Sequence, residues 1–109
     1  MIYNNTIYGN GIGHGGSCCY PAIVISPGTG NVIKNNIVFN NAVNGIANSA
    51  TSTVISNNLT VDPKFLDSAT SNFRLQSTSP AIDNGTSSIA QGITILFNGS
   101  APDIGAYEY

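Results

Sequence analysis

Residue types that carry out catalysis are scarce in this chain, and those present are widely spaced. Residues 1–61 contain one lysine, Lys34, and one histidine, His14, but no Asp or Glu. A Ca²⁺ site takes about six to eight oxygen ligands, usually with carboxylates among them. We therefore expect no catalytic residue, metal or cofactor in this chain, and we interpret Lys34 as a solvated lysine on the outer face of a strand.

His14 lies in a glycine-rich run, Gly11–Gly16. A phosphate-binding loop would need a following helix pattern and a Lys-Ser/Thr pair, and neither follows here. The chain has no second histidine with which His14 would share a metal. We interpret His14 as a turn residue, and we take it with Tyr8 and Tyr20 as the candidate carbohydrate-binding residues, because an exposed tyrosine ring can stack on a sugar.

Cys18 and Cys19 are the only cysteines, and they are adjacent. Neighbouring Cα atoms lie about 3.8 Å apart, closer than the roughly 4.4–6.8 Å of an ordinary disulfide. Two interpretations stay open. One is a strained vicinal disulfide that stiffens a loop and presents a flat sulfur face to a sugar, and the other is a pair of unpaired, partly buried thiols.

The remaining candidate cluster lies near the C-terminus. If Asn72–Leu75 is a strand, then Phe73 and Leu75 share one face and Arg74 lies on the other. Two carboxylates, Asp83 and Asp103, follow later in the chain. We expect Arg74 to form a structural ion pair with one of them.

Composition excludes several classes of protein. The chain has 109 residues, of which 41% are hydrophobic and only 7% charged, against about 25% charged in typical domains. Its net charge is −2, with three basic residues. Nucleic-acid binding needs several cations on one face, and a bilayer span needs about 18 or more consecutive apolar residues, so neither is expected. Fifteen Asn and 12 Gly favour a β-rich fold with many tight turns.

An internal repeat in the sequence indicates how the candidate residues are positioned. The matching segments are Asn4–Asn10, Asn35–Asn41 and Asn57–Asp62, each of which begins with Asn-Asn. The second and third begin 22 residues apart, and the first and second 31 apart, which is one repeat plus about nine inserted residues. We place the insertion within 13–21.

A period near 22 with three short β-branched runs predicts one turn of a triangular coil, whose strands stack in parallel on the next coil. Inward aliphatic side chains then form the core. One Asn of each pair, namely Asn5, Asn36 or Asn58, is expected to hydrogen-bond its equivalents above and below as an asparagine ladder. A leucine-rich repeat would need regular leucines, whereas only four are present. The predicted fold is all-β, a right-handed parallel β-helix.

From Asp62 the pattern changes, and residues 62–109 hold most of the charge. A solenoid needs an atypical terminal unit, because an uncovered strand edge invites aggregation. We therefore expect two parts: residues 1–61 as coils from the C-terminal part of a longer solenoid, and residues 62–109, called the tail below, as an irregular cap over the last coil.

Both parts resemble known sequences. The Asn-Asn coils resemble the repeat of pectate-lyase-like parallel β-helices. The tail resembles the choice-of-anchor Q type module of bacterial surface proteins, which reads DPxF, (D/N)FRL, SPAIDxG and DIGAYEY. The matching residues here are Asp62–Phe65, Asn72–Leu75, Ser79–Gly85 and Asp103–Tyr109. One departure is that residues 96–102 lack the basic Arg-Pro stretch that usually precedes the last block, so no anion-binding role is carried over to them.

The resemblance implies export to the cell surface or medium and a carbohydrate-rich setting. Residues 1–10 show no signal-peptide pattern, so we expect the parent protein to begin upstream and its further coils to be the partners of this chain. The fold alone does not select an activity. We expect a non-catalytic segment of a protein that binds or processes polysaccharide. The alternatives are the end of a polysaccharide lyase or glycoside hydrolase with its site upstream, and an adhesin or structural spacer.

Overall fold

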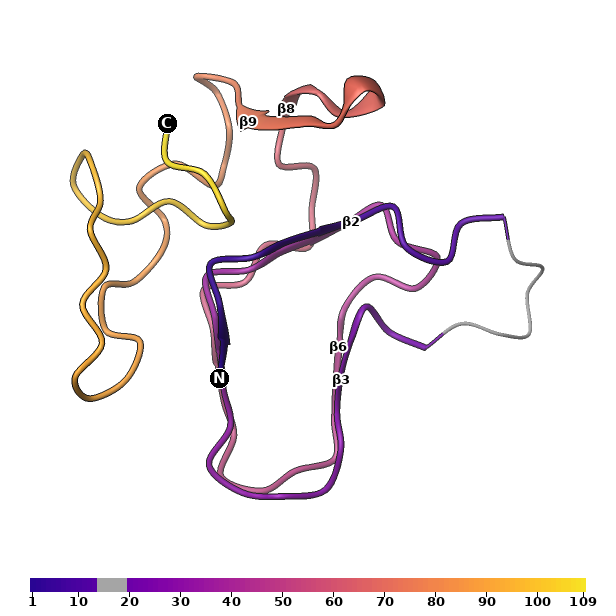
Figure 1. Cartoon of the computed structure of the whole chain (residues 1–109), viewed down its shortest axis with the longest axis vertical. Coiled ribbons are helices and arrows are strands. Elements are labelled where there is room, and N and C mark those ends of the chain that lie inside the picture. Colours follow the sequence, from indigo (N-terminus) through magenta and orange to yellow (C-terminus); the bar gives the residue numbers. More distant parts are fainter. Residues whose placement is uncertain (14–19) are drawn as a thin grey trace.

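The computed structural model describes residues 1–13 and 20–109, and its regular structure is β (Figure 1). Among these residues the single-turn 3-10 helix η1 (Ser68–Thr70) is the only helix, and none is long and apolar enough to cross a bilayer. The strands are β1 (Ile2–Tyr3), β2 (Thr6–Tyr8), β3 (Ile23–Ile25), β4 (Val32–Lys34), β5 (Ile37–Phe39), β6 (Ile46–Asn48), β7 (Val54–Ser56), β8 (Phe65–Asp67) and β9 (Asn72–Leu75).

Strands from successive repeats pair in parallel. The orders are β1-β4-β7, β2-β5 and β3-β6, and Ile33 aligns with Ile2 on one side and Ile55 on the other. An isolated parallel bridge joins Ile37 to Leu59. Each passage of the chain through these pairs is called a layer below. The first layer holds β1 to β3, the second β4 to β6, and the third β7 and the segment around Leu59.

Bends between the short strands depend on asparagine. Asn4, Asn35 and Asn57 each follow a strand of the β1-β4-β7 sheet and have φ of 53°, 55° and 52°. Most side chains clash in this left-handed region, whereas Asn is one of the few residues that enter it at low cost. The bend therefore recurs at the same place in every layer, and the layers superpose when viewed along the short axis of the molecule (Figure 1).

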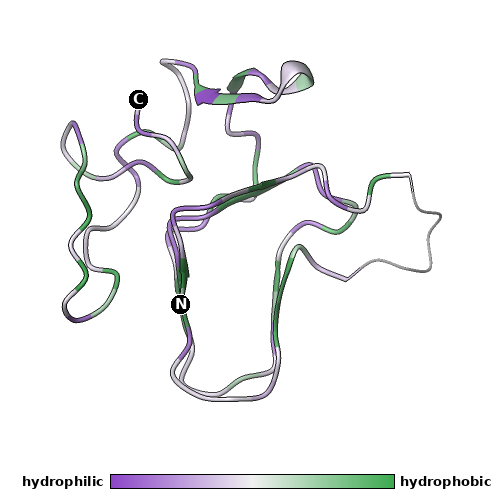
Figure 2. Ribbon diagram, viewed as in Figure 1, coloured by the Kyte–Doolittle hydropathy of each residue, from purple (hydrophilic) through white to green (hydrophobic). Residues whose placement is uncertain are grey.

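The inner core is aliphatic. Ile23, Ile25, Ile33 and Val38 are its buried members, and Ile2 packs against them from the first layer. In β3 the middle residue, Val24, is instead 49% exposed, as the twofold periodicity of a strand requires. Green apolar segments accordingly alternate with purple polar corners around the layers in Figure 2.

The tail returns along the side of the stack. It begins in the third layer, forms the antiparallel pair β8–β9, and places that pair beside the outer face of β2 (Figure 1). Its hydrogen bonds reach Asn57 in the third layer, Asn35 in the second and Thr6 in the first. The tail therefore lies along the side of all three layers and not over the last layer as the expected cap, because its apolar residues pack on the outer face of the strands.

A second core explains this course. Ile37 lies on the outer face of β5 and is 1% exposed, because Phe65, Leu75, Ala81 and Ile104 of the tail form a buried cluster with it. Neighbouring residues of β5 therefore serve different cores, with Val38 in the inner one and Ile37 in the outer one. An apolar outer face is costly to leave in water, and the tail covers it.

Candidate functional site

Asn5, Asn36 and Asn58 form a continuous ladder of hydrogen bonds. The Nδ2 of Asn5 donates to Oδ1 of Asn36 over 2.9 Å, and the Nδ2 of Asn36 donates to Oδ1 of Asn58 over 2.9 Å. The same two oxygens also accept the backbone N–H groups of Asn5 and Asn36, at 3.1 and 3.0 Å. Asn36 is fully buried, so these bonds satisfy polar groups that water cannot reach.

The ladder also satisfies strand carbonyls at the bend. Asn36 Nδ2 lies 2.9 Å from the oxygen of Lys34 in its own layer and 3.1 Å from that of Ile2 in the layer above. Asn58 repeats this arrangement one layer later, with Ser56 and Ile33. Each ladder residue thus ties two layers together at a corner.

Asparagines at another corner build a second ladder, which sequence reasoning missed. The backbone N and Nδ2 of Asn10 both donate to Oδ1 of Asn41 over 3.0 Å. Asn41 in turn donates its backbone N–H to Oδ1 of Asn44 over 2.8 Å. The signal was present in the sequence, since Asn10 and Asn41 lie 31 residues apart, as do Asn5 and Asn36. The third layer has Pro63 at the next position, so Asn44 of the second layer ends this ladder.

The outward Asn of the second and third bends docks the tail. Asn35 is fully buried, and its side chain pairs with the backbone of Thr86, donating over 2.8 Å and accepting over 2.9 Å. The Nδ2 of Asn57 donates to the oxygen of Asn84 over 3.1 Å. In the second and third pairs, one Asn therefore joins layer to layer and the other joins layer to tail. In the first pair, the buried Oδ1 of Asn4 has no hydrogen-bond partner among the described residues.

Two glycines of the tail allow close approach to the layers. A Cβ on Gly105 would lie 2.6 Å from Cδ1 of Ile37, and its φ of 107° disfavours any other residue. A Cβ on Gly85 would lie 2.7 Å from the oxygen of Pro102 and 3.1 Å from Nδ2 of Asn35. Both positions lie where the tail backbone meets the second layer, so glycine is required there.

Carboxylates of the tail bind backbone amides. Oδ1 of Asp83 accepts the N–H groups of Ser100 and Ala101, at 2.8 and 3.1 Å. These bonds, first that of Ala101 and then that of Ser100, hold the pKa of Asp83 below its usual 3.8. Asp103 accepts the N–H groups of Asp83 over 2.8 Å and Tyr109 over 2.6 Å. The acidic residues therefore fold the tail onto itself.

The predicted ion pair of Arg74 is wrong. Among residues 1–13 and 20–109, no salt bridge links Arg74 to Asp83 or Asp103, because both carboxylates are engaged by backbone N–H groups. The Arg74 guanidinium instead lies 5.4 Å from the ring centre of Tyr107, a cation–π contact. Arg74 does lie on the face of β9 away from Leu75, as the strand pattern predicted.

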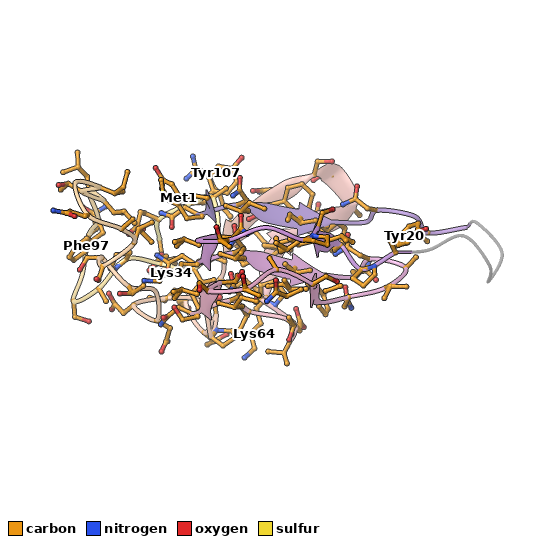
Figure 3. All side chains as sticks on the ribbon, turned by 90° about the horizontal axis from the view of Figure 1, so that it is seen from below. Met1, Tyr20, Lys34, Lys64, Phe97 and Tyr107 are labelled. Atoms are coloured by element: carbon orange, nitrogen blue, oxygen red, sulfur yellow. The ribbon has the colours of Figure 1, made fainter. Side chains whose placement is uncertain are left out.

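Of the candidate sugar-binding residues, Tyr8 and Tyr20 have different surroundings. The ring of Tyr8 packs among Phe39, Phe65 and Phe73, with centroids 5.2 to 6.4 Å away, and its hydroxyl lies 3.2 Å from Oγ of Ser68. Tyr8 is thus a packing residue at the edge of the outer core. Tyr20 is 82% exposed and lies toward the opposite end of the molecule from Phe97 of the tail (Figure 3). His14, Cys18 and Cys19 lie outside the described residues.

Lys34 is also a docking residue. Its Nζ donates to the oxygen of Ser88 in the tail over 2.6 Å, which differs from the solvated lysine expected from sequence. Over the part of the chain that the structure describes, no three His, Cys, Asp or Glu residues gather as a metal site would require. Comparison of the chain with protein-family models, curated proteins and solved structures finds no match.

Proposed function

We propose that this chain is the C-terminal end of a right-handed parallel β-helix of the pectate-lyase-like kind. Parallel pairing of β1, β4 and β7 in one register supports the proposal, as do the two asparagine ladders. Residues 1–61 would be the last coils and residues 62–109 a choice-of-anchor Q type module that stabilises them. In this proposal an upstream coil would stack on the first layer, where Ile2, Asn5 and Ile7 line an open surface depression.

The single observation that carries this proposal is where the tail motifs lie. The DPxF block supplies buried Phe65, and the FRL block supplies buried Leu75. The SPAIDxG block supplies Ala81 and the DIGAYEY block Ile104, both of which join Phe65 and Leu75 around Ile37. All four blocks that resemble the module thus contribute to one contact with the layers, as a module built to bind a β-helix would require.

The chain itself acts, in this proposal, as a non-catalytic part of an exported, polysaccharide-associated protein. Its ionisable groups support this assignment, because Lys34, Asp83 and Asp103 each have a structural partner. General acid–base catalysis needs such a group within reach of a substrate proton. These three instead hold the tail to the layers or to itself.

Tyr20 is the residue we assign to polysaccharide contact. The tail covers the outer face of β2 and β5, whereas the β3–β6 side carries no tail contact among the residues described, and Val24 is exposed there. Tyr20 precedes this sheet and offers the most exposed tyrosine ring of the described residues, at 82%. An exposed planar ring on a chain with only 7% charged residues suits a sugar better than it suits an anion.

Affinity electrophoresis of the full chain through gels that contain neutral or acidic polysaccharides tests the function. We expect retardation by at least one polysaccharide, loss of retardation in Tyr20→Ala, and normal retardation in the matched control Tyr109→Ala, since Tyr109 is 62% exposed on the tail. Mobility unchanged in every gel would contradict the binding role and favour a spacer. Release of unsaturated uronate or new reducing ends would contradict the non-catalytic assignment.

A further inference from the structure

Four Asn-Gly pairs occur in the described chain, beginning at Asn10, Asn44, Asn84 and Asn98. In such a pair the backbone nitrogen of the glycine can attack Cγ of the asparagine. The new C–N bond closes a succinimide ring, the bond from Cγ to Nδ2 breaks, and Nδ2 leaves as ammonia with the proton of the glycine amide. Water then opens the ring and leaves either aspartate or isoaspartate.

Hydrogen bonds restrain this chemistry at three of the pairs. Asn10 and Asn44 are members of the second ladder, so their side chains are held against Asn41. At Asn84 both reacting groups are engaged, because its Nδ2 donates to the oxygen of Ile82 over 2.8 Å and the N–H of the following Gly85 donates to that of Pro102 over 2.8 Å. Attack at these sites needs prior local opening.

Asn98 differs from the other three. It is exposed, and within residues 1–13 and 20–109 neither its side-chain amide nor the N–H of Gly99 has a hydrogen-bond partner. Gly99 has φ of +84°, and a Cβ there would collide with the Asp83 carboxylate. Glycine is therefore required at position 99, although it is also the residue that leaves the Asn98 side chain most open to attack.

We propose that Asn98 is a site of spontaneous deamidation and that the modification loosens the C-terminal end of the tail. The backbone N–H of Asn98 donates to Oε2 of Glu108 over 3.3 Å, and that of Ser100 donates to Asp83 over 2.8 Å. Isoaspartate adds one methylene to the backbone between these two donors, so both bonds cannot keep their geometry. Either product also adds a negative charge to residue 98, whose backbone N–H is bonded to the Glu108 carboxylate.

Timed peptide mapping of the folded full chain at mildly alkaline pH tests the site. We expect Asn98 to convert about tenfold faster than Asn84, because reaction at Asn84 waits for local opening. The urea-unfolded chain is the matched control, in which the difference should shrink to less than about threefold once no structure protects any site. Equal rates at Asn98 and Asn84 in the folded chain, or faster conversion at Asn10 or Asn44, would overturn the proposal.

Hydrogen exchange tests the consequence. After conversion, the amide protons of Ser100 and Ala101 should exchange about tenfold faster, whereas that of Leu59, which donates to Asn36 in the layers, should be unchanged. Asn98→Gln, in which ring closure is slower, should keep slow exchange at Ser100 over the same incubation. Unchanged exchange at Ser100 in the converted chain would contradict the loosening and leave only the chemistry at Asn98.

Discussion

Single asparagines determine how this molecule is held together. In each Asn-Asn pair, the first residue takes the left-handed backbone conformation and the second points inward. Among the inward residues, the side-chain amide of Asn36 bonds to both neighbouring layers and to its own strand. Buried amides of this kind are costly to remove, because their partners are left without water or protein to bond.

Replacement of Asn36 by alanine should therefore lower the free energy of unfolding by about 3 kcal/mol, since several buried donors and acceptors lose their partner. Urea unfolding followed by circular dichroism measures this change. The matched control is Asn5→Ala at the exposed end of the same ladder, with a loss nearer about 1 kcal/mol. Equal losses in the two variants would show that the ladder adds nothing beyond local packing.

Asp83 makes stability depend on pH. Its folded-state pKa is lowered below 3.8 by the N–H groups of Ala101 and Ser100, so the carboxylate stabilises the fold at every pH above its ordinary value. The contribution is lost as pH falls below 3.8 through the lowered folded pKa. Thermal unfolding from pH 7 (neutral) down to about pH 2 should show this loss in the unmodified chain and a flatter profile in Asp83→Asn. Parallel profiles for both chains would contradict this role of Asp83.

At the scale of elements, the side chains of β2 and β5 point alternately to the two faces of each strand, and this alternation divides them between the inner and the outer core. Residues on one face of these strands join the inner core, and those on the other join Phe65 and Leu75 of the tail. The strands could be predicted from sequence, because β-branched runs recur every 22 or 31 residues between Asn corners. The course of the tail could not, since its four motifs share no period and meet only through contacts such as that of Gly105 with Ile37.

The site residues also divide into those that could be predicted from sequence and those that could not. The inward Asn residues repeat with the layers, so periodicity finds them. Arg74 was predicted to pair with a carboxylate because of its charge. In the structure Asp83 and Asp103 accept backbone N–H groups instead, and such bonds cannot be read from the sequence. Tyr8 was assigned to the surface, but Phe73, 65 residues later in the chain, packs on its ring.

Adjacent residues of β8 lie on opposite faces of the strand, one buried and one exposed. Phe65 is 8% exposed in the outer core, whereas Leu66 is 53% exposed. Phe65→Ala should cost about 3 kcal/mol, because a buried aromatic ring leaves a cavity, and Leu66→Ala less than about 0.5 kcal/mol. Differential scanning calorimetry of the two variants measures both. Similar midpoints would mean that the tail does not pack on the layers through β8.

At the scale of the whole molecule, two cores share one set of strands. The inner core lies between the sides of each layer, and the outer core lies between the layers and the tail. The tail begins in the third layer and reaches Thr6 in the first, so it joins all the layers through side-on contacts (Figure 3). Loss of the tail would expose the outer face of β2 and β5, and so we expect layers and tail to unfold together.

Nuclear Overhauser contacts in the isotope-labelled full chain test the central claim most directly. Stacked layers with a tail along their side predict contacts of the Asn36 side-chain amide with both Asn5 and Asn58, together with contacts of the Ile37 δ1 methyl with the α protons of Gly105. Absence of the Asn36 contacts would contradict the stacking. Asn36 contacts without any between Ile37 and Gly105 would contradict the position of the tail.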